Sequence, residues 1–200
     1  MLHNGHTKTF MHFPLLVDIG DRPCLVVGGG KVAARKVAML REFGAAVTVV
    51  APAPNGQDAR SPLNAGGGGV HWVRRAFQDD DVEGQTLVVA ATDDAELNGR
   101  VAALCRARGI PVNVVDDPPN CTFIFPAVVR KGPIVAAVSS GGASPVAAKL
   151  VRDKVARLVT DDFVAAVASQ GARRQELKKK YPDPQERRRV CEEELAKWKD

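Results

Sequence analysis

The sequence predicts an α/β protein, with a Rossmann-type parallel sheet domain followed by a β-hairpin and a small helical C-terminal domain. One observation is an apolar segment, residues 24–27, that runs into three consecutive glycines and then into a helical pattern from Lys31 to Phe43. A second is the alternation of strand-length apolar segments with helical patterns, which is typical of parallel βαβ units with right-handed crossovers. A third is the change of pattern after residue 120, which predicts the hairpin and the helices.

The glycine turn is the first candidate binding site. In a dinucleotide-binding fold, Gly28 would permit the tight turn and Gly30 would let the backbone approach a pyrophosphate. Ala33 stands where a third glycine often lies, and it is small enough for the helix to sit close to the strand. The helix N-terminus would then direct its N–H groups at the phosphates. A turn that only closes a strand-to-helix corner is the alternative interpretation.

The second predicted strand, residues 47–50, lacks the acidic residue that commonly binds the cofactor ribose at its end. It continues as Ala51-Pro52-Ala53-Pro54, so the backbone or other groups would have to recognise the ribose. The missing acidic residue therefore does not decide between NAD and NADP, whereas the lack of an arginine just after Val50 favours NAD. Residues 52–69 are predicted to form a loop because they contain three prolines and five glycines.

Three further strands are expected at residues 70–73, 86–91 and 112–115. The sequence Thr92-Asp93-Asp94 caps a predicted helix that ends at Gly109. Residues 79–83 are too few and too acidic for a full helix. The last of these strands ends at Asp116 and Asp117, before two prolines.

The predicted hairpin joins residues 123–130 and 134–139 through Lys131-Gly132-Pro133. A lone apolar hairpin is not stable in water, so a second copy of the chain is expected to cover it. Ser144 and Pro145 are predicted as the N-cap and first residue of a helix. Helices are expected at residues 145–159, 161–170, 172–180 and 184–197, and an additional edge strand at Phe13 to Val17.

The composition, 45% hydrophobic and 26% charged over 200 residues, is that of a globular protein. No apolar run approaches the roughly 18 residues of a membrane span, and the N-terminus lacks the apolar core of a signal peptide, so a cytoplasmic location is expected. The four cysteines are scattered without a C-x-x-C pair and are predicted to be free thiols. No metal site is expected from them or from the four histidines.

The net charge of +5 is unevenly distributed. Lysines and arginines cluster at residues 130–157 and again at 173–189. Such clusters indicate either a solvated helical face or a partner rich in negative charge. The low aromatic content of 5% argues against nucleic acid as that partner.

The segments VVGGGKVAARK, ATDD, NVVDD, CTFIFPAVV and AVSSGGASPVAAKLVRDK occur in this order. Their succession resembles the precorrin-2 dehydrogenases of sirohaem synthesis, both the stand-alone enzymes and the N-terminal half of the multifunctional sirohaem synthases. The resemblance runs from about His12 to Trp198. It implies NAD-dependent oxidation of precorrin-2 to sirohydrochlorin, with iron insertion in some members. It also implies an NAD-binding domain at 1–117, a dimerisation hairpin at 118–143 and a helical domain at 144–200, assembled as a homodimer. No methyltransferase module is expected to follow, since the sequence stops at Asp200.

The resemblance implies a set of site residues as well. Asp116 matches an aspartate implicated in both dehydrogenation and chelation, and Ser140 matches a serine at the tetrapyrrole site that is phosphorylated in some members. The other implied contacts are Gly28, Gly30, Lys31, Val32, Pro52, Ala53 and Thr92 to the cofactor, and Asn113, Gly141 and Gly142 to the substrate. Lys31 departs from the acidic residue of some multifunctional members, which leaves the detailed hydrogen bonds to the cofactor open.

The chemistry of the residues agrees with this assignment. Ligands of such sheets bind at the carboxyl ends of the strands, where Asp116 is predicted to lie. Purely structural roles are the alternative interpretation: Asp116 would be a turn residue before Pro118, and Ser140 would form the corner between hairpin and helix. A substrate with many carboxylates would fit the basic second half and the backbone donors at residues 140–143. Two functional alternatives remain: an enzyme that also inserts iron at the same site, and an NAD-sensing regulatory module that binds nucleic acid.

Overall fold

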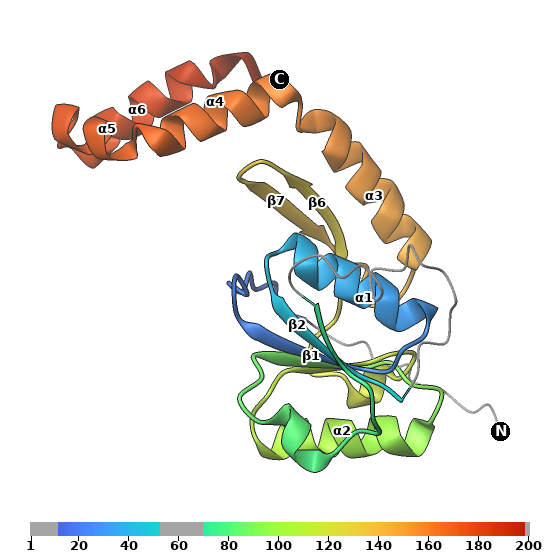
Figure 1. Ribbon diagram of the computed structural model, residues 1–200. Helices are drawn as coiled ribbons and strands as arrows, with labels where there is room; N and C mark the ends of the chain where they lie inside the picture. Colours follow the sequence, from blue (N-terminus) through green and yellow to red (C-terminus); the bar gives the residue numbers. More distant parts are fainter. Residues whose placement is uncertain (1–11, 53–69, 199–200) are drawn as a thin grey trace. The chain divides into compact units, whose positions relative to one another are not determined.

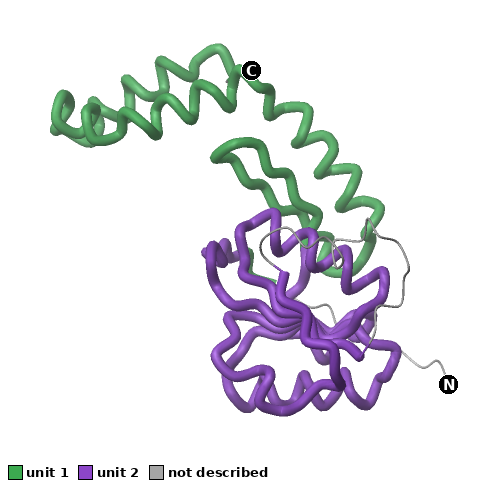
Figure 2. The backbone as a smooth tube through the Cα atoms, in the orientation of Figure 1, with its two compact units in different colours: residues 1–14, 126–200 green, residues 15–125 purple. Residues whose placement is uncertain are grey.

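The computed structural model describes residues 12–52 and 70–198 (Figure 1). Backbone contacts divide the chain into two compact units (Figure 2). One unit is residues 15–125, and the other is residues 126–200 together with residues 1–14.

Five parallel strands form the sheet of the first unit, in the order β3-β2-β1-β4-β5. The strands are β1 (Pro23–Val27), β2 (Ala46–Val50), β3 (Val70–Val73), β4 (Leu87–Ala90) and β5 (Val112–Val114). Helix α1 (Lys31–Glu42) covers one face of the sheet and α2 (Ala95–Ala107) covers the other (Figure 1). The predicted Rossmann-type parallel sheet is confirmed.

The central strand β1 is buried on both faces, which explains its uninterrupted apolar sequence. On one face, Val37 of α1 packs in a cluster with Val26 and Val49. On the other face, Val101 of α2 packs in a second cluster with Leu25. Gly44 follows α1 with a φ of 81°, and its N–H donates to the Arg41 carbonyl oxygen at 2.9 Å, so the predicted glycine stop is confirmed.

The outer edge of β5 is occupied by the chain that follows it. A short 3₁₀ turn, η2 (Pro118–Asn120), reverses the direction of the chain. Thr122 then donates its N–H to the Val112 carbonyl oxygen and accepts from the Val112 N–H through Oγ1, both at 2.8 Å. These bonds satisfy backbone groups that an edge strand would otherwise leave exposed.

Two predicted strands differ from the structure. The hairpin begins at Ala127 rather than at residue 123, because the preceding segment lies along β5 and Pro126 has no N–H for pairing. Phe13 to Val17 belongs to neither sheet, and these apolar side chains are exposed, so the expected edge strand was wrong.

The acidic segment at 79–83 forms only a short 3₁₀ helix, η1 (Asp79–Val82), as predicted.

The second unit combines a two-stranded antiparallel hairpin with helices. The hairpin is β6 (Ala127–Lys131) and β7 (Ile134–Val138), with Ala127 opposite Val138. The helices are α3 (Pro145–Leu158), α4 (Asp161–Ala172), α5 (Arg174–Lys180) and α6 (Pro184–Glu194), followed by η3 (Ala196–Trp198). The predicted order of a hairpin followed by four helices is confirmed, with ends shifted by a few residues.

The hairpin turn is fitted to the helices around it. Lys131 Nζ donates to the carbonyl oxygens of Ala156 at 3.0 Å and Val159 at 2.6 Å, which lie at the C-terminal end of α3. Gly132 has a φ of 53°, and a Cβ there would lie 2.6 Å from Cγ1 of Val164 on α4. A side chain at residue 132 would therefore meet both backbone strain and a steric overlap.

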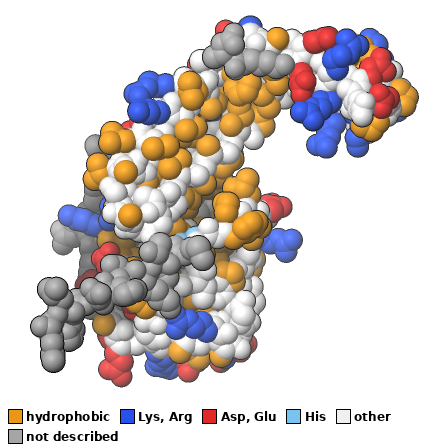
Figure 3. Space-filling view, turned by 180° about the vertical axis from the view of Figure 1, so that it is seen from behind, with side chains coloured by type: hydrophobic (Ala, Val, Ile, Leu, Met, Phe, Trp, Pro, Cys, Tyr) orange, Lys and Arg blue, Asp and Glu red, His pale blue; other side chains and the backbone are white. Residues whose placement is uncertain are grey.

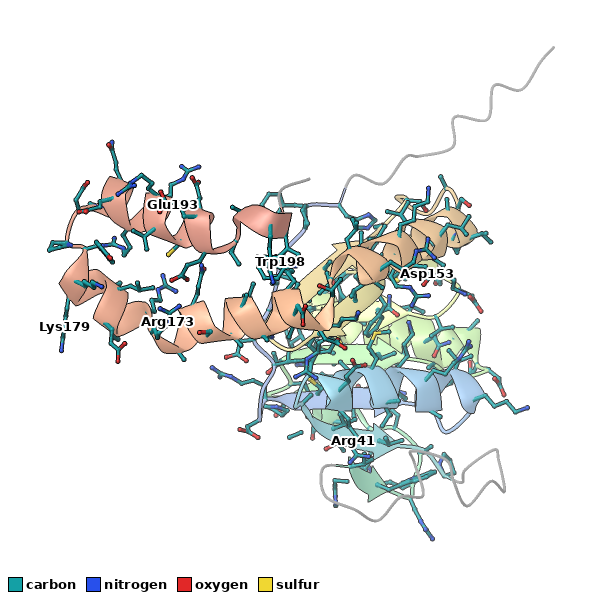
Figure 4. All side chains as sticks on the ribbon, turned by 90° about the horizontal axis from the view of Figure 1, so that it is seen from above. Arg41, Asp153, Arg173, Lys179, Glu193 and Trp198 are labelled. Carbon is teal, nitrogen blue, oxygen red and sulfur yellow. The ribbon has the colours of Figure 1, made fainter. Side chains whose placement is uncertain are left out.

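Figure 4 shows α6 alongside α4 and α5, with Arg173 and Lys179 on the α4–α5 side and Glu193 on α6. Gln170 donates to the Cys191 carbonyl oxygen at 2.9 Å, and Arg173 pairs with Glu194 at 3.1 Å. The ring of Trp198 lies 5.3 Å from that of Phe163 on α4. No helix in the described part of the chain is both long and apolar enough to cross a membrane.

Candidate active site

The register of the parallel sheet brings three turns to one edge. Val27 of β1 is opposite Ala90 of β4, and Ala90 is opposite Val114 of β5. The residues that follow these three positions therefore emerge together at the carboxyl edge of the sheet. They are the glycine turn, the β4–α2 turn and the segment that contains Asp116.

Gly28 is required by the packing of the turn. Its φ is 121°, and a Cβ on Gly28 would overlap the backbone carbonyl of Ala91 after β4. Its N–H donates to the Val50 carbonyl oxygen at 3.0 Å. Gly30 differs, because a Cβ there would meet nothing within 4 Å. The backbone of Gly30 thus faces open space at the start of α1.

The N-terminus of α1 is uncapped. Gly30 provides no capping side chain, and the first turn contains no acidic residue. The N–H groups of the first turn therefore have no intrahelical acceptor and are directed outward beside the glycine turn. Lys31 is exposed and Val32 is half-buried. This arrangement is suited to an anion such as a pyrophosphate.

The β4–α2 turn is held by a buried amide that the sequence analysis did not single out. Asn98, which is 7% exposed, accepts from the Thr92 hydroxyl at 2.7 Å and the Thr92 N–H at 3.2 Å, and donates to the Thr92 carbonyl at 3.0 Å. Asp94 caps α2 by accepting from the N–H groups of Glu96 and Leu97. A polar residue at an apolar position of the α2 pattern was the signal that could have identified Asn98.

The turn after β2 is described only in part. Pro52 is exposed, and the carbonyl oxygen of Ala51 accepts from the Trp72 indole N–H at 3.1 Å. Ala53, which is expected to contact the cofactor, lies outside the described residues.

Asp116 has an unusual backbone conformation. Its φ is 59°, a left-handed value that costs energy for a residue with a side chain and that often marks a functional position. Its side chain is exposed and accepts no hydrogen bond from the described residues. Asp117 differs, since its carboxylate accepts from the Asn120 amide at 2.6 Å within η2. Of the two neighbouring aspartates, Asp116 is the one whose carboxylate is available.

Asn113 and Cys121 hold the loop that carries Asp116. Asn113, 8% exposed, donates through Nδ2 to the Phe123 carbonyl oxygen at 3.1 Å, so its amide is directed at that loop. Its role as a substrate contact stays a prediction. Cys121 Sγ accepts from the Val114 N–H at 3.2 Å, and burial raises the pKa of this thiol. All four cysteines are free.

The predicted substrate loop belongs to the second unit. Ser140 Oγ donates to the Ser144 carbonyl oxygen and accepts from the Ser144 N–H, both at 2.9 Å. Gly141 and Gly142 have φ values of 63° and 87°. Ser144 in turn caps α3 by accepting from the Ala147 N–H at 3.1 Å. Ser140 thus holds a glycine-rich loop at a helix N-terminus, and its contact with substrate stays a prediction.

Lys36 of α1 was not among the predicted site residues. Its ammonium lies 3.8 Å from the centroid of the Phe125 ring. Burial lowers the pKa of Lys36, with a smaller contribution from the neighbouring Arg35, while Cys121 and then Asp116 act in the opposite direction. Among the described residues, no group of three His, Cys, Asp or Glu side chains is placed to hold a metal ion.

Comparison with known proteins adds independent information on the family. Residues 15–127 match a family described as "Putative NAD(P)-binding". The chain is 42% identical over 175 residues to the siroheme synthase of Methylobacillus flagellatus and 45% identical over 180 residues to that of Thioalkalivibrio sulfidiphilus. These alignments cover 88% and 90% of this chain but only 37% and 36% of the relatives.

A solved structure of "SirC, precorrin-2 dehydrogenase" has the same fold. Its TM-score is 0.65 at 22% identity, with 94% of this chain and 98% of that chain covered. The match to the family includes all five strands of the parallel sheet, the uncapped N-terminus of α1 and the Asp116 loop. On this evidence, the chain belongs to the putative NAD(P)-binding family.

Proposed function

We propose that this chain oxidises precorrin-2 to sirohydrochlorin and that NAD is the hydride acceptor. The observation that carries the proposal is the meeting, at one edge of the parallel sheet, of an open glycine turn with the available carboxylate of Asp116. The names of the similar proteins, siroheme synthase and precorrin-2 dehydrogenase, supply the substrate.

The glycine turn and the start of α1 would hold the cofactor. The N–H groups beside Gly30 would bind the pyrophosphate, and the open space over Gly30 leaves room for it. The first turn of α1 contains no acidic side chain that would repel phosphate. The absence of an arginine directly after Val50 favours NAD over NADP, because a 2′-phosphate would have no guanidinium partner there. Bound NAD would supply the acceptor for the hydride.

Asp116 would accept the proton that leaves the substrate. Oxidation removes a hydride and a proton from the macrocycle, and a carboxylate at the sheet edge is placed to accept that proton at one of its oxygens. The left-handed backbone at Asp116 fixes where the carboxylate emerges. The loop of Ser140 and the glycines after it, at the N-terminus of α3, would bind carboxylates of the substrate.

We also propose that the chain is a cytoplasmic homodimer. On α3, the side chains of Val146, Leu150, Val151 and Leu158 are between 47% and 75% exposed. Figure 3 shows hydrophobic side chains gathered over the hairpin and α3, whereas Lys, Arg, Asp and Glu predominate at the α5–α6 end. An apolar surface of this kind indicates a protein interface.

The test of the activity is a turnover assay with purified protein, precorrin-2 and NAD, followed by the absorbance of sirohydrochlorin. Formation of sirohydrochlorin with stoichiometric NADH is expected, and NADP should give a much lower kcat/KM. A protein that binds NAD but leaves precorrin-2 unchanged would contradict the proposal. The same assay with added ferrous or cobaltous ion then measures chelation separately.

A further inference from the structure

The hydrogen-bonded part of β4 ends just before Thr92. The Ala91 N–H donates to the Val27 carbonyl oxygen at 2.8 Å, and the Ala90 carbonyl oxygen accepts from the Val115 N–H at 3.0 Å. In the described part of the chain, these are the last backbone hydrogen bonds that join β4 to the strands on either side of it. Thr92 is half-buried, so its N–H and C=O need partners other than a neighbouring strand.

The side chain of Asn98 takes the place of that strand. Its Oδ1 accepts from the Thr92 N–H at 3.2 Å and from the Thr92 hydroxyl at 2.7 Å, and its Nδ2 donates to the Thr92 carbonyl oxygen at 3.0 Å. Asn98 is only 7% exposed, one helical turn before the buried Val101 and Ala102 of α2. An amide buried on an apolar helix face is costly unless its hydrogen bonds are made, and all three of these go to one residue.

The residue that Asn98 holds adjoins the glycine turn. A Cβ on Gly28 would overlap the Ala91 carbonyl and would lie 3.2 Å from the Thr92 nitrogen. The Thr92 backbone therefore lies directly beside Gly28, at the carboxyl edge where ligands of such sheets bind. A shift of Thr92 would move one wall of the turn that leads to the open space at Gly30.

We propose that Asn98 is a positioning residue for the cofactor: its amide holds the backbone of Thr92 against the glycine turn, so that the two turns form one preorganised site before NAD binds. The proposal rests on the NAD binding of the proposed function, and not on the oxidation of precorrin-2. A site that must be ordered during binding loses affinity to the entropy of ordering. Because α2 covers one face of the sheet, Asn98 satisfies Thr92 from that face and leaves the edge open.

The first test needs neither cofactor nor substrate. Amide hydrogen exchange of the ¹⁵N-labelled full chain measures how readily the Thr92 N–H is released. In Asn98→Leu this amide should exchange roughly tenfold faster or more, whereas the amide of Val89 in the middle of β4 should keep its rate. An unchanged rate at Thr92, or an equal rise at Thr92 and Val89, would overturn the proposal.

The second test is the affinity for NAD, measured by calorimetric titration. Asn98→Ala and Asn98→Leu both remove the three hydrogen bonds, but alanine leaves a cavity and leucine fills the space. NAD affinity should therefore fall roughly tenfold in both variants, although a thermal melt should show the larger loss of stability in Asn98→Ala. A wild-type affinity in Asn98→Leu would overturn the proposal.

The wild type separates this proposal from the proposed function. A wild type that binds NAD without oxidising precorrin-2 would contradict the oxidation, and the comparison of NAD affinities would still decide the role of Asn98. A wild type that binds no NAD would overturn both.

A matched control lies four residues earlier on the same helix. Asp94 is exposed and caps α2 by accepting from the N–H groups of Glu96 and Leu97. Asp94→Ala should lower the stability of α2 but leaves the amide of Asn98 on Thr92, so NAD affinity should stay near that of the wild type. A loss of affinity equal to that of Asn98→Leu would mean that the stability of α2, and not the hydrogen bonds to Thr92, determines NAD binding, and would contradict the proposal.

Discussion

Gly28 and Gly30 lie two residues apart, yet the structure constrains them in different ways. Gly28 is fixed by the protein itself, through its φ of 121° and the close approach of Ala91. Gly30 has an ordinary φ of −84° and open space around it. Gly28 is thus required by the packing of the turn, whereas the open space at Gly30 leaves room for a ligand.

This difference predicts opposite results for two substitutions. Gly30→Val should leave thermal stability near that of the wild type and sharply reduce NAD affinity, because the branched side chain fills the space over the turn. Calorimetric titration with NAD and a thermal melt measure both effects. An unchanged NAD affinity would remove this turn from the cofactor site.

Gly28→Ala is the companion variant. It should destabilise the protein by about 2–4 kcal/mol, because the alanine meets both the strained φ and the Ala91 carbonyl. Chemical denaturation measures the free energy of unfolding. A stability equal to that of the wild type would mean that the β1–α1 turn can relax away from β4.

Asp116→Asn tests the proposed base. Asparagine has nearly the same shape but cannot accept the proton, and it tolerates a left-handed backbone well, so the fold and NAD affinity should be retained. Loss of general-base catalysis should lower kcat roughly 10²–10⁴-fold. A change confined to KM would instead assign Asp116 a role in holding the substrate.

The control for this prediction is its neighbour. Asp117 accepts from Asn120 in η2, so Asp117→Asn should affect stability more than kcat. If Asp117→Asn lowered kcat and Asp116→Asn lowered only stability, Asp117 would be the base instead of Asp116. Loss of oxidation with intact metal insertion in Asp116→Asn would separate the groups used by the two activities.

At the scale of elements, the side chain of Lys131 links the β6–β7 hairpin to the C-terminal end of α3. Lys131 caps two carbonyl oxygens at the end of α3, where a positive charge also complements the helix dipole. Lys131→Met should therefore lower the free energy of unfolding by about 1–3 kcal/mol. Lys149→Met, at an exposed position of α3, should change it by less than about 0.5 kcal/mol. Equal melting temperatures for the two variants would show that the cap contributes nothing.

At the scale of the whole molecule, the proposed homodimer predicts that the exposed apolar side chains of α3 lie in the subunit interface. Leu150 is 60% exposed, whereas Phe125 packs against the core cluster under α1 and is less suitable for a test. Leu150→Asp should convert a dimer into monomers, as measured by sedimentation at micromolar concentration. Lys178→Asp, on the charged helix α5, should leave the assembly unchanged. A wild-type protein that sediments as a monomer would contradict the dimer.

Much of the fold follows from the sequence alone. The strands of the sheet, the glycine turn and the succession of helices were predicted because each depends on local signals: apolar runs, glycine stops and capping residues. The position of Asp116 at the sheet edge follows from the same signals, since parallel strands end at a common edge. The late start of the hairpin at Ala127 could not be predicted, because it depends on the pairing of Thr122 with β5.

The sequence by itself determined the class of fold, and it predicted the cofactor turn and the candidate base. Only the tertiary structure decided which of two glycines is needed for packing, which of two aspartates is available, that Asn98 binds Thr92, and that Lys36 lies on the Phe125 ring. The physical reason is that these properties are distances between residues far apart in the chain. Most of the sheet domain separates Lys36 from Phe125 in the sequence, and only folding brings the Lys36 ammonium onto the Phe125 ring.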